Sequence, residues 1–453
     1  MIDIPQKRIE FINKEAYRIL GEMEDLPNPK PSTSILKGSA KEKDVLDWTD
    51  KVIDAPVRTS SIIITGEKVD WKECYKERCY GFNEELFKSF QKLIKTIEKD
   101  QTISSKISTE FLETICFDWF VNTYKNQQAK NDLSSHILEE VNESIKEYII
   151  HYPILYLDIE GFIDVGKTKL GYFTKEYLEK LERNFIKRNP SKKENNPYEY
   201  VRKELQGEVL IILKVKAEIQ KAKQIALEEC SLAIDVLKLC SITTDIPNYK
   251  LSFDIDSRTS QNLKNRVIHT IPAKPDEFIF SIYRIPKLYK IDKAEWKEMK
   301  QKQLRDFHEF LLNKGKYNSE LKRLIVNSIR RYSAAISKDD LNQRIVELFT
   351  ILESLLLKDE NVPIVESLCK YGSKLVFKKI EDRKHFIKLT QKMYSIRSAY
   401  IHHGVNKKID LGDLRQLQYI TLMLMTQLIK RLEKYKTKLS ILQEIDDEIL
   451  KAY

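Results

Sequence analysis

The sequence predicts a predominantly helical protein with a mixed α/β middle region and an antiparallel helical bundle in its C-terminal part. Charged residues make up 32% and hydrophobic residues 42% of the 453 positions, with only 12 glycines and 13 prolines, as is typical of long solvated helices around real cores. Apolar residues recur at helical spacing toward both ends of the chain, and they alternate with other residues, as in strands, in its middle. Because this length allows two or three domains, we divide the chain into a mostly helical region 1–150, a mixed region 151–293 and the bundle 294–453.

The first region is predicted to hold four helices and one strand. A short helix from Lys7 to Met23 is ended by the proline-rich stretch 27–32, and a β-rich run follows at 60–65. The later helices begin near Asn83 and Thr109, and the last of them carries the apolar residues between Ile137 and Ile149. Trp119 lies beside Phe120 at helical spacing, so we expect it in the core, although an exposed tryptophan would be able to stack on bases.

The middle region is predicted to mix strands with one long helix. Residues 152–162 alternate in strand fashion, Asp164-Val165-Gly166 supplies a turn, and the chain stays extended over 170–173. We expect an exposed loop at 189–197, a long helix over 200–240, and two strand-like pieces at 251–256 and 278–285.

A phosphate-binding loop is one alternative for this region, because Gly161 and Gly166-Lys167-Thr168 match that pattern formally. Such a loop opens a helix at its lysine. Since Tyr172-Phe173 continues an extended segment, nucleotide hydrolysis is the less favoured interpretation.

The last region is predicted to be all helix, with short connections that suit an antiparallel bundle. Asp339 and Asp340 place carboxylates at the positive end of one helix, and Asp410 with Asp413 does the same for the last long one. The predicted helices are Ala294 to Asn313, Ser319 to Ile336, Lys338 to Leu357, Val362 to Phe377, Glu381 to His403, and Leu411 to Tyr435 or beyond.

Charge and cysteine usage narrow the function classes. The formal net charge of +10 suits a nucleic-acid partner, and it suits a lysine-rich protein without such a partner equally well. The six cysteines form no C-x2-C pair and have no histidine at zinc-ligand spacing, so we expect neither a metal site nor a disulfide framework, and no cofactor. They are Cys74, Cys79, Cys116, Cys230, Cys240 and Cys369.

We expect a cytoplasmic protein without membrane segments. The first five residues lack the basic-then-apolar order of a signal peptide. The most apolar helix, around Leu417 to Leu432, is interrupted by polar residues and therefore predicts a buried core helix.

Residues 393–404, MYSIRSAYIHHG, hold the strongest functional pattern. Arg397 lies in the middle of an apolar helical stripe, where a guanidinium needs an anionic partner or a cleft. His402 follows five positions later, and Gly404 is suited to end the helix in the left-handed conformation. Residues five apart on a straight helix lie about 140° from each other, so this pair converges only if the helix breaks near His402 or a second chain supplies the partner.

This Arg-x4-His spacing, with Tyr394 three residues before the arginine, resembles the signature of HEPN ribonucleases. The helix RIVELF-T-ILESLL, residues 344–356, is similar to the corresponding helix of the ApeA-like branch, which is found in prokaryotic antiphage defence. The resemblance covers about the last third of the chain. It implies a HEPN-type bundle and a metal-independent endoribonuclease whose cleft is built across a two-fold homodimer.

The resemblance implies roles for the residues of the motif. Imidazole titrates near neutral pH, so His402 is the predicted acid/base, and the fork-shaped guanidinium of Arg397 is predicted to bind phosphate. Ser398 stands where many HEPN proteins carry a polar residue that orients the site. In the family, glycine often follows the motif histidine directly, whereas this chain has His403 at that position. Either imidazole could therefore be the acid/base, and the spacing favours His402. Glu353 is open as a salt-bridge partner of Arg397 or as part of the cleft.

Alternatives from other classes stay open. In one, Arg397 pairs with a core carboxylate such as Glu353 and His402 only ends a helix; the bundle is then a non-catalytic module that dimerises or grips RNA. The basic residues Lys378, Lys379, Arg383 and Lys384, with Lys374 and Lys388, are predicted to draw RNA toward the dimer axis or to form a solvated helix start. A phage-derived trigger is a further partner that the resemblance leaves open.

Overall fold

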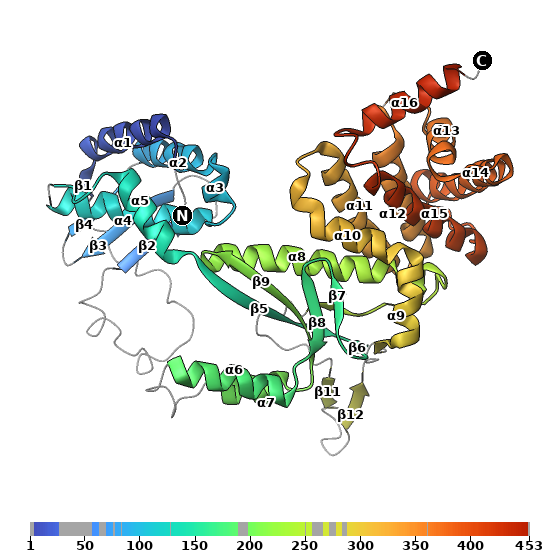
Figure 1. The fold of residues 1–453 in the computed structure, drawn as a ribbon, viewed down its shortest axis with the longest axis horizontal. Coiled ribbons are helices and arrows are strands. Elements are labelled where there is room, and N and C mark those ends of the chain that lie inside the picture. Colours follow the sequence, from blue (N-terminus) through green and yellow to red (C-terminus); the bar gives the residue numbers. More distant parts are fainter. Residues whose placement is uncertain are drawn as a thin grey trace. The chain divides into compact units, whose positions relative to one another are not determined.

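The computed structural model, shown in Figure 1, describes most of the chain, and all structural statements below refer to that part. The described residues are 4–26, 57–62, 69–75, 78–82, 84–126, 128–188, 198–249, 251–255, 266–270, 278–282, 288–359 and 361–451. The predicted loops at 27–32 and 189–197, and residues 63–65 of the predicted first strand, lie outside them.

The chain divides into two compact units. The first comprises Met1–Tyr148 together with Val215–Ile225, and the second comprises Ile149–Lys214 together with Ala226–Tyr453. Apart from 215–225, the predicted middle and C-terminal regions therefore fall within one unit. Broadly, the protein is mostly helical with a mixed α/β middle, as predicted.

The first unit packs four helices around an apolar core beside a small antiparallel sheet. The helices are α1 (Gln6–Gly21), α2 (Glu84–Glu98), α4 (Thr109–Asn126) and α5 (Leu133–Ser144), with the short α3 (Gln101–Ser104) between them. The sheet has the order β1-β4-β3-β2, from β1 (Glu24–Leu26), β2 (Val57–Ile62), β3 (Val69–Tyr75) and β4 (Arg78–Gly81).

Two predictions for this unit have clear outcomes. Trp119 is buried, and its indole N–H donates to the carbonyl of Asn131 at 2.8 Å, which confirms its place in the core. The prediction that Ile149 shares a helix with Ile137 is wrong, because α5 ends at Ser144 and Ile149 lies in β5 (Lys146–Leu155). The β-branched and aromatic residues 148–152 favour the extended strand.

A sheet with the order β10-β5-β9-β8-β7 forms the middle of the chain. Its other strands are β7 (Ile163–Val165), β8 (Thr168–Tyr172), β9 (Val209–Ala217) and β10 (Asp254–Ile255). The predicted single helix over 200–240 is wrong: α7 (Tyr198–Leu205) and α8 (Ile219–Leu239) flank β9. Gly207 adopts a positive φ of 88°, which ends the first helical stretch, and the alternation of Leu213, Val215 and Ala217 with lysines then favours a strand.

A tight hairpin replaces the candidate phosphate-binding loop. Val165 pairs with Thr168, so Gly166 and Lys167 form the turn between β7 and β8. Gly166 has a positive φ of 59°, and a Cβ there would lie 2.5 Å from Leu311 Cβ, so the turn needs glycine both for its conformation and for its close approach. Because Lys167 does not open a helix, the context that a phosphate loop requires is absent from this segment.

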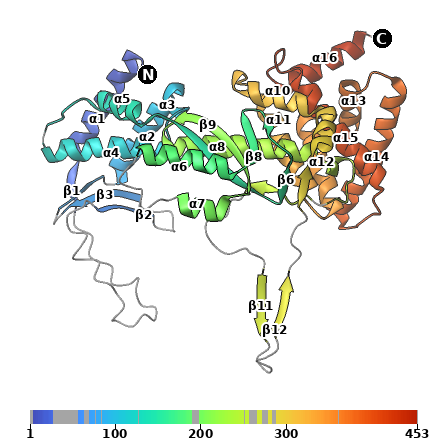
Figure 2. The same cartoon turned by 60° about the horizontal axis from the view of Figure 1, so that its bottom comes forward.

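Shorter strands and a helix complete the middle of the chain. β6 (Leu157–Ile159) pairs in parallel with β13 (Tyr289–Ile291), and α6 (Lys175–Arg188) follows the hairpin. β11 (Arg266–Thr270) and β12 (Phe278–Ile282) run antiparallel side by side (Figure 2). The strands predicted at 251–256 and 278–285 are confirmed within the residues that β10 and β12 cover.

Helices make up the rest of the second unit. They are α9 (Lys293–Met299), α10 (Arg305–Asn313), α11 (Glu320–Ile336), α12 (Leu341–Leu356), α13 (Ile364–Val376), α14 (Ile380–His403), α15 (Leu411–Ile429) and α16 (Lys438–Lys451). The predicted helix over 294–313 is interrupted by a π-helical turn, Lys300–Leu304, and the last predicted helix is two, α15 and α16.

Helices α11 to α15 pack on one another around a continuous apolar interior. The predicted carboxylate caps are confirmed for α12 and α15. The Asp340 side chain accepts from Asn342 N at 2.8 Å, and the Asp410 side chain accepts from Asp413 N at 2.9 Å. Among the described helices, none has the length and apolar character needed to cross a membrane.

Candidate functional site

Helix α14 carries the Arg-x4-His pattern, and its local structure follows from its sequence. Phe386, Leu389, Met393 and Ile396 are buried and form the predicted apolar stripe. At the C-terminal end Gly404 adopts the left-handed conformation, with φ of 63°, and its N–H donates to the carbonyl of Tyr400 at 3.1 Å. The predicted glycine cap is therefore confirmed.

Arg397 lies inside the bundle and faces α12. Its Nη2 is 3.3 Å from Oε1 of Glu353, and the two side chains are only 14% and 18% exposed. Its Nη1 is 3.4 Å from the hydroxyl of Tyr394, and its guanidinium lies 5.2 Å from the centre of that ring. Phe349 packs edge-on against the same ring at 5.3 Å between centroids. Arg397 thus has an anionic partner and an aromatic one within its own chain.

The pair formed by Arg397 and Glu353 is a charge contact and is not completed by hydrogen bonds. Arg397 Nε and Glu353 Oε1 are both buried without a hydrogen-bond partner among the described residues. Burial raises the pKa of the Glu353 carboxyl, and the neighbouring Arg397 guanidinium opposes that rise. A partly desolvated cation with unused hydrogen-bonding capacity is a group that a phosphate can satisfy.

His402 and His403 lie on the outside of the last turn of α14, and both are exposed. Their ring centroids are 6.5 Å apart. Both side chains stand at the negative end of the helix dipole, a place that suits cationic groups. Either ring is therefore open to solvent as a proton donor or acceptor.

Arg397 and His402 do not converge within one chain. α14 continues without interruption to His403, which excludes a helix break near His402, one of the two routes to convergence expected from the sequence. On such a helix the two residues lie about 7.5 Å apart along the axis and about 140° apart around it. Of the two routes to convergence expected from the sequence, a second chain is the one that remains.

The other residues of the motif differ in whether their side chains contact a partner. Tyr394 contacts Arg397 directly, and Tyr400 donates its hydroxyl proton to the capping carboxylate of Asp340 at 3.1 Å. Ser398 is half-buried, and no hydrogen bond of its side chain is found in the described part of the chain. Tyr394 and Glu353 therefore belong to the Arg397 cluster by contact, and Ser398 by position on α14 only.

The predicted basic residues gather at the opposite end of α14. Lys378, Lys379 and Lys384 are exposed, whereas Arg383 is half-buried and donates from Nε to the carbonyl of Phe377 at 2.9 Å. Nineteen residues separate Arg383 from His402, which corresponds to about 28 Å along a helix. The structure therefore does not bring these cations to the Arg397–His402 end.

Arg344, which opens the helix that resembles the ApeA-like branch, has a structural role. It is buried and donates from Nη2 to the carbonyls of Ile336 at 3.0 Å and Lys338 at 2.7 Å, and from Nη1 to the carbonyl of Pro247. Burial lowers its pKa. This arginine ties the start of α12 to the preceding loop and to the middle of the chain.

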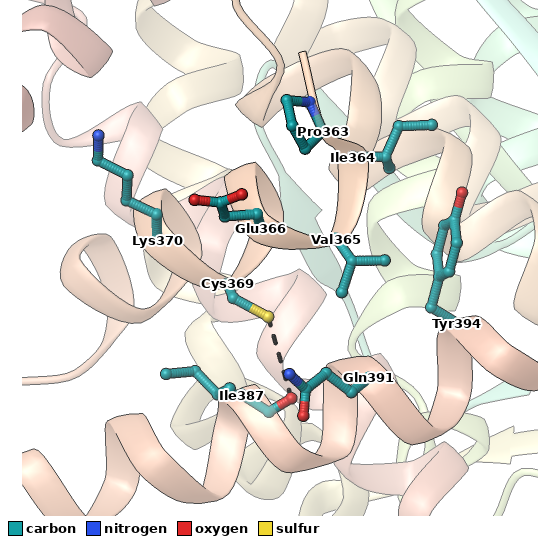
Figure 3. Close-up of a pocket in the computed structure, with 9 residues that line it drawn as sticks. All are labelled: Pro363, Ile364, Val365, Glu366, Cys369, Lys370, Ile387, Gln391 and Tyr394. Carbon is teal, nitrogen blue, oxygen red and sulfur yellow. Dashed lines mark hydrogen bonds between the residues drawn. The ribbon is translucent and has the colours of Figure 1, made fainter.

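A groove between α13 and α14 adjoins the Arg397 cluster and was not foreseen from the sequence. Its volume is about 760 Å³, and Tyr394 forms part of its wall. Figure 3 shows Tyr394 and Lys370 at opposite ends of this groove, with Cys369 between them. Ile387, Gln391 and Tyr394 share one face of α14 at helical spacing, a signal that the sequence does contain. The facing residues of α13, Val365 and Cys369 with Glu366 and Lys370, have the same helical spacing.

Searches for related proteins and for metal sites gave no further assignment. The chain matches no family model, no curated protein and no solved structure. Among the described residues, no group of three or more His, Cys, Asp or Glu side chains is arranged to hold a metal ion.

Proposed function

We propose that this protein is a metal-independent endoribonuclease of the HEPN type, active as a homodimer built through its C-terminal helices. The observation that carries the proposal is the placement of Arg397 and an exposed His402 on one unbroken helix, with the arginine hydrogen bonds left incomplete. The resemblance of residues 344–356 and 393–404 to the ApeA-like branch supports it.

Exposed apolar side chains around the end of α14 support the dimer. Ile401, Val405 and Leu411 are 44%, 48% and 40% exposed, although each has a large hydrophobic side chain. Such residues clustered in sequence around the two histidines suit a self-complementary contact across a two-fold axis. This contact brings the two α14 ends together, so that two Arg397–His402 pairs border one cleft.

The reaction proceeds on RNA without an added nucleophile. One imidazole accepts the proton of the ribose 2′-hydroxyl while its oxygen attacks the adjacent phosphorus. The bond from phosphorus to the 5′-oxygen breaks, and that oxygen takes a proton from a second, protonated imidazole or, more slowly, from water. The products are a 2′,3′-cyclic phosphate and a 5′-hydroxyl. Arg397 stabilises the charge that develops on the phosphate oxygens.

Glu353 sets a condition on this chemistry. Because it holds Arg397 at 3.3 Å, the substrate phosphate approaches the guanidinium in competition with the carboxylate or through the uncommitted Nε. Protonating Glu353 removes its competing charge, and burial raises the pKa of this carboxyl. The Glu353→Gln variant is therefore expected to keep or increase the affinity for RNA, whereas a catalytic carboxylate would lose activity on the same change.

The decisive experiment is cleavage of RNA in excess EDTA by the full-length protein. Wild type is expected to leave 2′,3′-cyclic or 3′-phosphate ends and to spare DNA. His402→Ala is expected to lower the rate by about 10²–10⁴-fold, and Arg397→Ala by about 10²–10³-fold. His385→Ala is the matched control, because His385 is exposed on the same helix and its Nε2 lies 2.6 Å from Gln416. A strict magnesium requirement refutes the mechanism.

Mixing two inactive variants tests the composite cleft. Arg397→Ala protein mixed with His402→Ala protein forms dimers that hold one intact copy of each side chain, and part of the activity is expected to return. His403→Ala, assayed alone, identifies which imidazole acts. A strictly monomeric active enzyme contradicts the composite site.

A second candidate is favoured by the ion pair between Arg397 and Glu353, which gives the arginine a structural partner. Under this alternative the bundle dimerises or grips RNA without cutting it. Wild type, Arg397→Ala and His402→Ala would then bind RNA alike, and none would cleave it.

The biological setting proposed is antiphage defence in the cytoplasm, and it rests on the family resemblance. Expression of the intact gene is expected to lower plaque numbers for some phage, and expression of the His402→Ala variant is not. Equal plaque numbers with both genes across a phage panel contradict this setting.

A further inference from the structure

A second pocket lies in the same unit as the bundle, between the β7–β8 hairpin and the helical segment α9–α10. Its volume is about 470 Å³, within the range of small-molecule sites in proteins. Phe162 and Asp164 line it from the hairpin side, and Trp296, Arg305 and His308 line it from the helical side. We call it the hairpin pocket.

Strained backbone shapes the helical wall of the hairpin pocket. Residues twelve apart on an uninterrupted α-helix, such as Trp296 and His308, lie about 120° from each other. The π-helical turn Lys300–Leu304 is wider and absorbs rotation, so that both residues line one pocket. Within it Gln303 adopts a positive φ of 63°, a conformation that is costly for a residue with a side chain.

The hairpin wall holds an aromatic ring that is fixed in place and yet exposed. Phe162 is 66% exposed. Its ring lies against the backbone of Gly171, where an added Cβ would fall 2.5 Å from Phe162 Cε1. With Trp296, half-buried on the other wall, it supplies an aromatic surface for a planar ligand.

The polar groups of the pocket have hydrogen-bonding and charge capacity to spare. Lys300 and Arg305 are exposed, and within the described residues neither forms an ion pair; Lys300 Nζ lies 5.1 Å from the centre of the Trp296 ring. His308 Nδ1 lies 3.2 Å from the N–H of Gly166, from which it accepts when unprotonated, and 3.2 Å from the carbonyl oxygen of Asp164, to which it donates when protonated. In the tautomer that accepts from Gly166, the ring proton is on Nε2, which is then a donor toward a ligand. Asp164 adds one carboxylate acceptor.

We propose that the hairpin pocket binds a nucleotide. The base stacks on Trp296 and Phe162 in place of the side chains of Lys300 and Lys169, whose ammonium groups lie 5.1 Å and 5.0 Å from the centres of these two rings. The phosphate is held by Arg305 and Lys300, with a further hydrogen bond from His308 Nε2. Asp164 accepts from an amino group of the base or from a ribose hydroxyl. This combination of two cations, one carboxylate and two aromatic rings matches a nucleotide better than a simple anion, which needs no aromatic wall.

The test is titration of the full-length protein with AMP, GMP, UMP and CMP, followed by calorimetry and by quenching of tryptophan fluorescence. At least one of these nucleotides is expected to bind saturably and to quench the Trp296 emission. Trp296→Leu is expected to weaken binding by roughly 5- to 150-fold, the measured range for loss of one stacking contact. Trp296→Phe retains a ring and is expected to keep affinity while losing the quench.

Control variants and control ligands separate nucleotide binding in the hairpin pocket from simple anion binding. Arg305→Gln is expected to weaken nucleotide binding at least tenfold, and Lys297→Gln, an exposed lysine of α9 outside the pocket, is expected to leave it unchanged. Inorganic phosphate or adenosine binding as tightly as AMP overturns the proposal, as does unchanged affinity of Trp296→Leu. A single-stranded RNA tetranucleotide serves as a further probe. A site for the end of an RNA chain is expected to bind it more tightly than a mononucleotide, whereas a site for free nucleotides is not.

The proposal is independent of the ribonuclease assignment. Arg397→Ala is expected to bind nucleotide as wild type does, whether or not that variant cleaves RNA.

Discussion

Replacing Arg397 by methionine tests how the bundle holds the central residue of the motif. The change keeps an unbranched side chain and removes the guanidinium, so Glu353 is left partly buried without its cation. Removing one partner of a fully buried pair costs roughly 3–5 kcal/mol, and because Glu353 is still 18% exposed we expect about 1–3 kcal/mol here. Glu353→Gln carries no charge to desolvate, so the double variant is expected to regain about 1–2 kcal/mol relative to the sum of the single changes.

The stability cost of Arg397→Met is expected to change with pH in a definite direction. Burial raises the folded-state pKa of Glu353 above its ordinary value of 4.5, so folding favours the protonated acid and stability falls as pH rises through that range. Without Arg397 nothing opposes the effect of burial, and the pKa rises further. The cost of Arg397→Met is therefore expected to be small near about pH 4 and to grow toward about pH 8. The double variant with Glu353→Gln should lose this dependence.

Hydrogen exchange of the amides in α12 and α14, measured by mass spectrometry across that pH range, reports the local free energy of opening. Such a local measurement is preferable to a global unfolding curve in a chain of two compact units. Arg383→Met is the matched control: Arg383 bonds the carbonyl of Phe377 and, among the residues that the structure describes, no carboxylate, so its cost should not vary with pH. Two results would refute the argument that this ion pair holds Arg397. One is a cost of the double variant equal to the sum of the two single-variant costs, and the other is a cost of Arg397→Met that does not vary with pH.

Three further changes test the scaffold. Gly404→Ala is expected to cost about 1 kcal/mol, because a Cβ is unfavourable in the left-handed cap of α14; a melting curve measures it. Arg344→Met removes buried bonds to backbone carbonyls and is expected to cost about 3–5 kcal/mol in thermal unfolding, and an unchanged melting temperature would contradict its structural role. Gly166→Ala is expected to cost about 2–4 kcal/mol, since it adds strain at positive φ and a clash with Leu311. Gly161→Ala, also at positive φ but with open space around it, should cost only about 1 kcal/mol, which isolates the clash.

Local signals in the sequence predicted the helices of the bundle well. The stripe that includes Met393 and Ile396 set the buried face of α14, and Gly404 set its end. The carboxylates of Asp340 and Asp410 marked the starts of α12 and α15. These features depend on residues within one or two turns of each other, so periodicity and capping rules are sufficient to find them.

Features that depend on the backbone path or on contacts distant in sequence were missed. The sequence pattern predicts a helix where the structure has β9, because the apolar residues 209–213 are compatible with a buried segment of either type. The π-helical turn depends on Gln303 adopting a positive φ, which nothing in its sequence neighbourhood indicates. The sequence leaves the approach of Glu353 to Arg397 as one of two options, since helical spacing predicts the faces of helices and does not predict which helices meet.

The two residues of the Arg-x4-His motif differ in how their side chains are held, and this difference links dimer formation to RNA binding. Arg397 is held within the bundle by a carboxylate and an aromatic ring, so its position is already fixed in a single chain. His402 is exposed beside Ile401 and has no fixed position relative to a substrate until another surface covers it. If a two-fold partner provides that surface, it excludes water from the end of α14 and strengthens the attraction between the guanidinium and an RNA phosphate. Dimerisation and RNA binding should then reinforce each other, because each supplies what the other lacks: the dimer desolvates the cleft, and the phosphate replaces Glu353 as the anion that Arg397 requires.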